Sequence, residues 1–266
     1  SPPKIMVGEE SIYDSMTLSL FYEGRTYQPA WSNDDGPLPQ ADSLIKAIRE
    51  ANLEGLRPDD YHLAKIEATL QGVRQNQDKT KLNPNRLADL DLLLTDAFLT
   101  YGSHLLAGRV NPVTVDAEWL VERRKADLVQ VLQTAIVANQ IEEALKALLP
   151  PYPGYARLRE ALAHYRDLAE KGGWQQVPDG PKLQLGDCDE RVPALWTRLM
   201  VTGDLEEALQ VERSEIPQRG EDATLFDEVL DQAVRRFQKR HGLAVDGVVG
   251  PATLAALNVS VEKRIR

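Results

Sequence analysis

Apolar residues recur at intervals of three and four along most of the chain, which places them on one face of an α-helix. This spacing predicts helices over residues 10–23, 38–52, 84–106, 126–137, 140–149 and 155–171, and a short helix that ends near Leu70. Gly24 is expected to end the first of them. Because apolar residues cover more than one face of residues 84–106, that helix is expected to lie at the centre of its domain. Strand signals are weak, with brief extended pieces expected at residues 28–31 and 113–115.

Glycine and proline then divide the chain. Gly172 and Gly173 end the last of these helices, and residues 177–182 (VPDGPK) have the composition of a linker, so a domain boundary is expected near Gly173. Beyond it, helices are predicted at residues 192–200, 229–240 and 252–257, with a polar loop at 202–223 and tight turns at 246–247 and 250–251. The pattern therefore predicts an all-α fold, with a larger helical domain followed by a small domain of three helices.

Composition narrows the class of protein. The chain has 266 residues, 42% hydrophobic and 27% charged, and a net charge of −10. That acidic balance argues against nucleic acid as a partner, because such binding needs cations that neutralise phosphates. The single cysteine, Cys188, excludes an internal disulfide, and four scattered histidines form no metal-binding pair. No cofactor and no metal are expected, and no apolar run reaches the roughly 20 residues of a membrane span.

Two groups of motifs resemble a known family. The patterns LxxGDxxxRVxxLxxRL at residues 183–199 and AVxxFQxxxGLxxDGxxGxxTxxAL at residues 233–257 resemble the peptidoglycan-binding domain of bacterial cell-wall proteins. The segments FYEGRTYQPAW (21–31), LLLTDAFLTYGSHLLAGRVNP (92–112) and ALLPPYPGYARLREALAHYRDLAEKGGW (147–174) resemble the helical scaffold domain of large L,D-transpeptidases. One departure is that family members carry a second DG turn before the Phe-Gln helix, where this chain has Leu225, Phe226 and Asp227.

The resemblance implies three parts and a function. Residues 1–173 are expected to form the scaffold domain, 174–260 the peptidoglycan-binding domain, and 261–266 the start of a linker to a catalytic domain that this chain lacks. The family's nucleophile is a cysteine in a Ser-His-Gly-Cys-x-Arg motif, which is absent here, since Ser103 and His104 lead into leucines. Cys188 stands among carboxylates that disfavour a thiolate. The chain itself is therefore expected to be no enzyme, and to be exported to the periplasm or cell envelope without a signal peptide in the given sequence.

The expected partners are peptidoglycan, through its glycan strand or stem peptide, and the chain's own catalytic domain. Cations on the solvent face of the 229–240 helix suit stem-peptide carboxylates, and neutral polar side chains nearby suit amides. Trp196 is compatible with stacking on an N-acetylsugar, although its apolar neighbours favour packing. The expected ligand-binding residues are Arg236, Gln238, Lys239, Arg240, Asp246, Thr253 and Trp196. The alternative is a structural or interaction scaffold without glycan affinity, which the acidic charge and the missing first DG turn favour.

Overall fold

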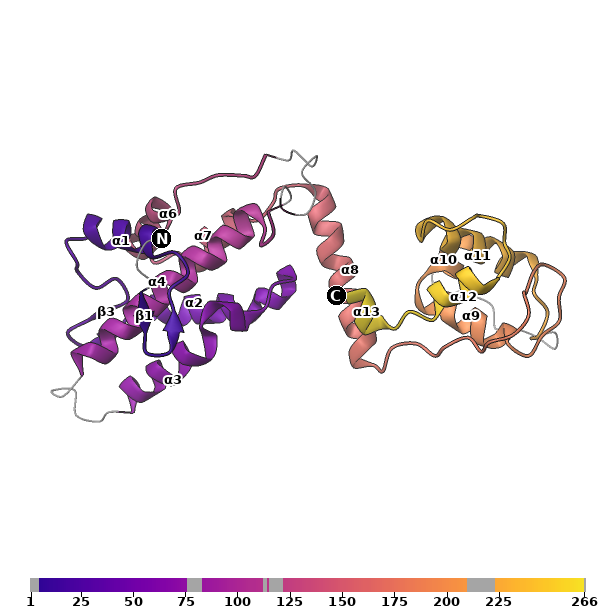
Figure 1. Cartoon of the computed structure of the whole chain (residues 1–266), viewed down its shortest axis with the longest axis horizontal. Helices are drawn as coiled ribbons and strands as arrows, with labels where there is room; N and C mark the ends of the chain where they lie inside the picture. The colour runs from indigo at the N-terminus through magenta and orange to yellow at the C-terminus, as the bar shows by residue number, and fades with distance from the viewer. Residues whose placement is uncertain (1–4, 76–82, 112–113, 115–121, 210–222, 266) are drawn as a thin grey trace. The chain divides into compact units, whose positions relative to one another are not determined.

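The computed structural model describes residues 5–75, 83–111, 114, 122–209 and 223–265, and these form an all-α protein with two short hairpins (Figure 1). The predicted fold class is confirmed. The chain divides into two compact units, unit 1 (Ser1–Glu160) and unit 2 (Ala161–Arg266). The division falls inside a helix, whereas the boundary expected from sequence follows that helix at Gly173, and the predicted domain limits stay a prediction.

Unit 1 is built around one long helix. Its elements are β1 (Met6–Val7), β2 (Glu10–Ser11), α1 (Ser15–Gly24), β3 (Ser32–Asn33), β4 (Gly36–Pro37), α2 (Pro39–Arg49), η1 (Glu50–Glu54), η2 (Pro58–Tyr61), α3 (Leu63–Arg74), α4 (Pro84–Ala107), α6 (Leu128–Ala138), α7 (Ile141–Ala147) and the start of α8 (Pro153–Glu170). The strands pair antiparallel as β1 with β2 and β3 with β4. The helix α4 packs against α1, α2, α3 and α6, so the predicted central position of this apolar helix is confirmed.

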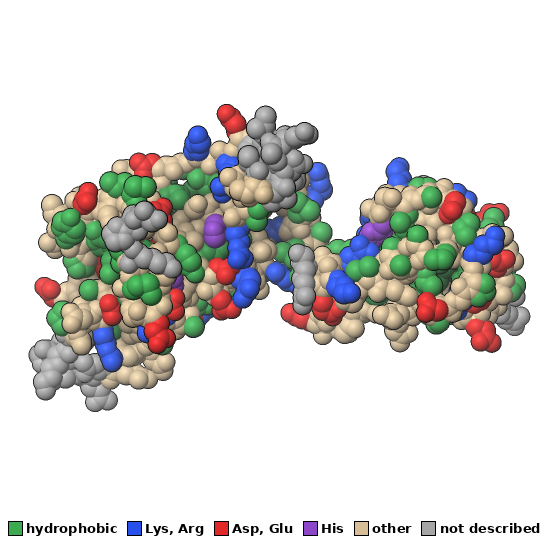
Figure 2. All heavy atoms as spheres, in the orientation of Figure 1, with side chains coloured by type: hydrophobic (Ala, Val, Ile, Leu, Met, Phe, Trp, Pro, Cys, Tyr) green, Lys and Arg blue, Asp and Glu red, His purple; other side chains and the backbone are tan. Residues whose placement is uncertain are grey.

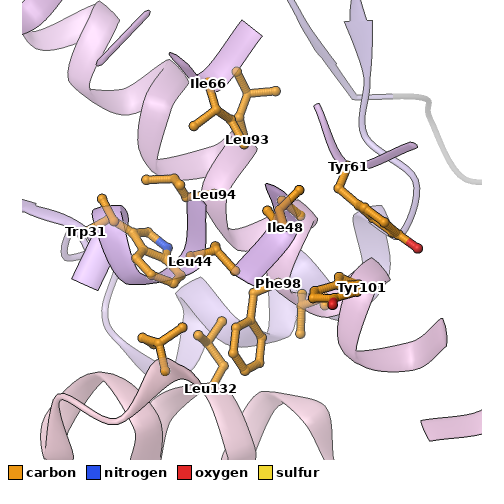
Figure 3. Close-up of a cluster of buried hydrophobic side chains, with 14 of the residues drawn as sticks. Trp31, Leu44, Ile48, Tyr61, Ile66, Leu93, Leu94, Phe98, Tyr101 and Leu132 are labelled. Atoms are coloured by element: carbon orange, nitrogen blue, oxygen red, sulfur yellow. The ribbon is translucent and has the colours of Figure 1, made fainter. Parts of the chain in front are cut away.

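The core of unit 1 gathers around Trp31, which is fully buried. Figure 3 shows Leu44 of α2 and Leu94 of α4 beside the indole ring. The indole N–H donates to Thr95 Oγ1 at 2.9 Å, so the polar end of the ring is satisfied inside the core. Truncation of a buried aromatic side chain of this size costs about 3–5 kcal/mol.

The first predicted helix begins later than expected and ends at the predicted residue. Residues 10–11 form β2, and α1 starts at Ser15 because the Asp14 side chain accepts a hydrogen bond from the Thr17 N–H at 3.0 Å. The helix ends at Gly24, as predicted, although Gly24 itself is not in a left-handed conformation. The left-handed residues after α1 are Thr26, with φ of 51°, and Tyr27, with φ of 61°.

Unit 2 carries the three predicted helices and more. Its elements after α8 are α9 (Val192–Val201), α10 (Asp204–Leu209), α11 (Glu228–Arg240), α12 (Pro251–Leu257) and α13 (Val261–Ile265). The helix α10 lies in the region predicted to be a polar loop, and it forms because Leu205 is fully buried in the unit 2 core. Residues 210–222 of that predicted loop, and most of the extended piece predicted at 113–115, lie outside the described residues.

The segment predicted to be a linker, residues 177–182, is anchored to unit 2 at its first residue. Val177 is 1% exposed, and its N–H donates to Asn258 Oδ1 at 2.9 Å while Asn258 Nδ2 donates back to the Val177 carbonyl at 2.9 Å. Leu183 then forms a β-bridge with Val249. Arg191 Nη2 also donates to the Pro181 carbonyl at 2.8 Å. The segment is therefore held to unit 2 near both of its ends, although residues 178–182 are exposed.

Candidate functional site

The loop that joins α11 to α12 is fixed by a single glutamine. Gln238 is 1% exposed, and its Oε1 accepts the backbone N–H groups of Asp246 at 3.1 Å and Gly247 at 3.0 Å. Its Nε2 lies 2.8 Å from Asp246 Oδ1, 3.0 Å from the Val248 carbonyl and 3.2 Å from Thr253 Oγ1. The amide thus holds both ends of the Asp-Gly turn, and the loop is rigid before any ligand arrives.

Glycine is required at the second position of this turn. Gly247 has φ of 74°, and a Cβ there would collide with Asp231 Oδ1 and lie 2.7 Å from Arg235 Nη2. Those two side chains form an ion pair at 2.7 Å, and Arg235 Nη1 also donates to the Val245 carbonyl at 3.2 Å. The turn therefore packs directly on the face of α11 that carries Asp231 and Arg235.

Two predicted ligand contacts serve the fold instead. The Gln238 amide is buried and bonded within the chain, and Thr253 is buried with its hydroxyl donating to the Val248 carbonyl at 3.2 Å. The expectation that these side chains meet ligand amides is therefore wrong for the conformation seen here. Asp246 is exposed, and the Val248 N–H followed by the Gln238 amide holds the pKa of its carboxyl below the usual range.

The predicted cations of α11 differ in their surroundings. Lys239 is exposed and Arg236 is half-buried, and since they are three residues apart they share one face of the helix. Arg240 forms an ion pair with Asp204 at 2.7 Å, so part of its guanidinium is already engaged. Figure 2 shows acidic and basic side chains interspersed over the surface of unit 2. Any charge-based recognition on this face is local to a few side chains.

The remaining predicted residue, Trp196, is half-buried and packs against the unit 2 core. A second aromatic group on this unit was not predicted. The guanidinium of Arg198, which is buried, lies 3.9 Å from the centroid of the Trp174 ring, and its Nε donates to the Leu257 carbonyl at 2.8 Å. Burial lowers the pKa of Arg198 to about 10. Arg198 belongs to the LxxRL part of the motif, so this arginine of the signature also serves the fold.

The C-terminal end of α11 is electropositive. The ring of His241 lies 4.2 Å from that of Phe237 and its Nδ1 lies 3.2 Å from Arg264 Nη1. Burial, followed by the charges of Arg264, Arg240 and Arg198, lowers the pKa of His241 to about 4. This histidine is therefore neutral at physiological pH, and the positive charge at this end comes from arginines.

Unit 1 contains a buried ionisable group that the sequence pattern did not reveal. Both ring nitrogens of His62 are hydrogen-bonded to carboxylates. Nδ1 lies 2.8 Å from Glu10 Oε2, and Nε2 lies 2.8 Å from Asp96 Oδ2. Asp96, fully buried on α4, also accepts the N–H of Tyr13 at 3.1 Å. These bonds fasten the β1–β2 hairpin to α4, which is a structural task.

The two residues first considered for catalysis, His104 and Cys188, make internal contacts. Burial and then the charge of Arg109 lower the pKa of His104, whose Nδ1 lies 3.0 Å from the Tyr61 hydroxyl. Cys188 is exposed and pairs through its backbone with Leu225. Within the described residues, no group of three or more His, Cys, Asp or Glu side chains is arranged to hold a metal ion. None of the described helices combines the length and the apolar character needed to cross a membrane.

Comparison with known proteins assigns both units. Residues 17–162, more than half of the chain, match the family model described as "Scaffold domain", and residues 191–257 match the model described as "Putative peptidoglycan binding domain". The N-acetylmuramoyl-L-alanine amidase CwlM of Mycobacterium tuberculosis is 42% identical over 79 residues, which are 30% of this chain and 19% of CwlM. The N-acetylmuramoyl-L-alanine amidase CwlL of Bacillus licheniformis is 37% identical over 78 residues, which are 29% of this chain and 19% of CwlL. The similarity thus spans about a fifth of each relative.

Proposed function

Because the chain belongs to the scaffold-domain family and also matches a peptidoglycan-binding domain, we propose that it binds peptidoglycan at the cell envelope and positions the polymer for an enzyme domain. The observation that carries this proposal is the match over residues 191–257, in which the motif residue Gln238 holds Asp246 and Gly247 in a pre-formed loop. Both relatives are named as N-acetylmuramoyl-L-alanine amidases. N-acetylmuramoyl-L-alanine is a unit of peptidoglycan, so these names support peptidoglycan as the ligand.

The proposed contact surface is the outer face of α11 beside the Asp-Gly turn. Lys239 and Arg236 lie on that face, and the part of the Arg240 guanidinium outside its ion pair adds further N–H donors. Stem-peptide carboxylates are the peptidoglycan groups that suit such donors. Exposed charge pairs contribute only about 0.2–1 kcal/mol each, so binding through this face is weak and weakens further as salt rises.

Co-sedimentation with purified wall sacculi tests this face. The double variant Arg236→Ala with Lys239→Ala is expected to bind about 3- to 10-fold more weakly at low salt, since two such pairs are lost. A matched control, Lys182→Ala with Lys263→Ala, removes two exposed lysines of the same unit and is expected to bind like the wild type. Equal binding by the first variant and the wild type would move the site to the surface around Trp196. Absence of binding by the wild type would overturn the proposal.

We further propose that the enzyme domain served is an L,D-transpeptidase domain with its own cysteine nucleophile. The resemblance of residues 21–31, 92–112 and 147–174 to the scaffold of those enzymes supports this partner. The names of the two relatives support an amidase domain as the alternative partner. With either partner, tethering raises the effective concentration of polymer at the active site. This chain alone is expected to turn over no disaccharide-tetrapeptide, and turnover that is lost on Cys188→Ser would contradict that.

The second candidate function is a structural scaffold without glycan affinity. The observation that favours it is that Gln238, Gly247 and Thr253 are all used by internal contacts, so the motif persists whether or not a ligand binds. In this case sacculi retain neither the wild type nor the variants, at any salt concentration.

A further inference from the structure

A groove of about 840 Å³ opens on unit 1 between α1, the loop at residues 26–29, the β3–β4 hairpin and the start of α4. Its size lies in the range typical of small-molecule sites. Among the residues that line it are Tyr22, Tyr27, Asn33, Asp34, Leu87 and Leu92. Neither the family matches nor the proposed contact surface on α11 explains this groove.

The floor of the groove is pre-organised. Asp91, only 4% exposed, accepts the Tyr22 hydroxyl at 2.6 Å and the backbone N–H groups of Ala30 and Trp31, each at 2.9 Å. Burial, followed by the charge of Asp91, raises the pKa of Tyr22, so the phenol stays protonated. The floor therefore presents a fixed shape with its buried carboxylate fully bonded.

One wall of the groove is strained. Thr26 and Tyr27 follow each other in the left-handed conformation, which costs a non-glycine residue about 1 kcal/mol or more. The Arg25 side chain holds this loop, because it donates to the carbonyls of Gln28 at 3.2 Å and Pro29 at 2.7 Å and to Gln133 Oε1 at 3.0 Å. Replacement of either residue by glycine would remove the conformational cost at that position.

The strained loop carries the aromatic ring of Tyr27, which does not pack in the core of unit 1. The Tyr27 side chain lines the groove, and the residue is 73% exposed. Its backbone N–H donates to the Tyr22 carbonyl at 2.8 Å, an interaction that glycine would make equally well. Strain that brings no packing gain marks a residue whose side chain acts on something outside the fold.

The charge of the residues that line the groove restricts the class of ligand that the groove can bind. Glu23 and Asp34 supply carboxylates, and Gln28 and Asn33 supply amides, while no Lys, Arg or His is among the described residues that line the groove. Such a lining repels anions, including stem-peptide carboxylates, and accepts hydrogen bonds from hydroxyl groups. A sugar combines neutral hydroxyl donors with an apolar ring face that suits an exposed tyrosine.

We propose that this groove binds a neutral saccharide, namely a stretch of the glycan strand, with Tyr27 stacked on a sugar ring. This identification of the saccharide rests on the proposed function, since peptidoglycan is the polymer that supplies the strand. Unit 1 then contacts the glycan through uncharged groups, whereas α11 of unit 2 contacts the acidic stem peptide.

Titration of the full chain with a neutral N-acetylglucosamine pentamer, followed by calorimetry and amide NMR, tests the groove. The wild type is expected to bind with an affinity that changes less than about twofold between low and high salt, because no ion pair is formed. Tyr27→Gly is expected to bind about tenfold more weakly, the effect of roughly 1.4 kcal/mol of stacking, with an unchanged or higher melting temperature. Thr26→Gly relieves the neighbouring strain, keeps the ring and is expected to retain binding within about threefold.

Tyr152→Ala is the matched control, since it removes another exposed tyrosine of unit 1 that does not line the groove, and it should bind like the wild type. Equal pentamer binding by Tyr27→Gly and the wild type, or no pentamer binding at all, overturns the saccharide site. The proposed function is tested separately, because Arg236→Ala with Lys239→Ala is expected to keep pentamer binding while it binds sacculi about 3- to 10-fold more weakly. A chain that binds sacculi but not the pentamer therefore leaves the proposed function standing and refutes only the groove.

Discussion

Replacement of Gln238 by alanine is expected to unfold the loop between α11 and α12 and to destabilise unit 2. The side chain is 1% exposed and accepts two backbone N–H bonds, at 3.0 and 3.1 Å. Its two amide hydrogens serve three acceptors between 2.8 and 3.2 Å, so about four hydrogen bonds exist at any moment. Alanine removes all of them, leaves the buried Gly247 N–H without its acceptor and leaves the Thr253 hydroxyl with only its bond to the Val248 carbonyl.

The magnitude follows from these bonds. Each contributes about 0.5–1.5 kcal/mol net, and buried groups left unpaired cost about as much again, so the expected loss is about 3–5 kcal/mol. That is a large share of the roughly 5–15 kcal/mol by which domains are stable. For a unit of this size, 1 kcal/mol shifts the melting temperature by about 4–8 °C, and the expected shift is about 12 °C or more.

Differential scanning calorimetry of the full chain measures this shift, and hydrogen exchange reports whether protection of the Asp246 and Gly247 amides is lost. Gln232→Ala is the control, because Gln232 is an exposed glutamine of the same helix and its removal is expected to change stability by less than about 0.5 kcal/mol. Gln238→Glu keeps the shape but sets a carboxylate beside Asp246, so its stability should improve as pH falls and that carboxylate is protonated. A loss below about 1 kcal/mol for Gln238→Ala would refute the assignment of Gln238 as the residue that fixes the loop.

Two further outcomes are expected. In thermal denaturation, Gly247→Ala should destabilise unit 2 by about 1 kcal/mol or more beyond Gly242→Ala. Both glycines have positive φ, but only at Gly247 do other atoms occupy the place of the Cβ. Equal losses of stability would contradict this. Burial alone would lower the pKa of His62, but its bonds to Asp96 and Glu10 outweigh burial and raise it. The stability that His62 contributes is therefore complete below pH 6.5, the pKa of a free imidazole, and is lost as pH rises through the raised pKa. The melting temperature should fall over that interval for the wild type and less for His62→Gln.

The helices were predictable because their signal is periodic and local. In α4, apolar residues on several faces indicated a buried helix, and Pro84 at its first position and Gly108 after its last fit the usual ends. α10 was missed because it has six residues and a polar composition, and the burial of Leu205 that holds it depends on the rest of unit 2. Contacts distant in sequence decide such short elements.

Contacts distant in sequence also decide the turn that follows α1. The helix ends at Gly24 as predicted, yet the left-handed conformation that a terminal glycine adopts at little cost falls on Thr26 and Tyr27. Asp91, more than sixty residues away, accepts the N–H groups of Ala30 and Trp31 and so fixes where the chain must leave the helix. Local preference is weaker than a buried carboxylate with several bonds.

The candidate site was predicted in part. Lys239 lies exposed on α11 as expected, but Gln238 was predicted to face a ligand because its amide is polar. Its position contained a signal against that expectation. Gln238 stands four residues after Val234 and next to Phe237, both buried, so the helical period places it at the edge of the core. A polar side chain at such a position is more readily explained by an internal hydrogen bond than by a ligand.

The motif residues of unit 2 make internal contacts, so the motif and the binding of a ligand can be lost independently. A change that abolished ligand binding by altering Lys239 would leave the Gln238 network and the Gly247 turn intact, and the sequence would still match the binding-domain family. The match therefore follows the fold of the loop, and under the proposed function affinity depends on side chains outside the motif. In unit 1 the proposed saccharide site would likewise depend on Tyr27, whose exposed ring the core does not use. Substitutions that keep the motif and change Lys239 or Tyr27 thus separate the folding of the two units from their binding.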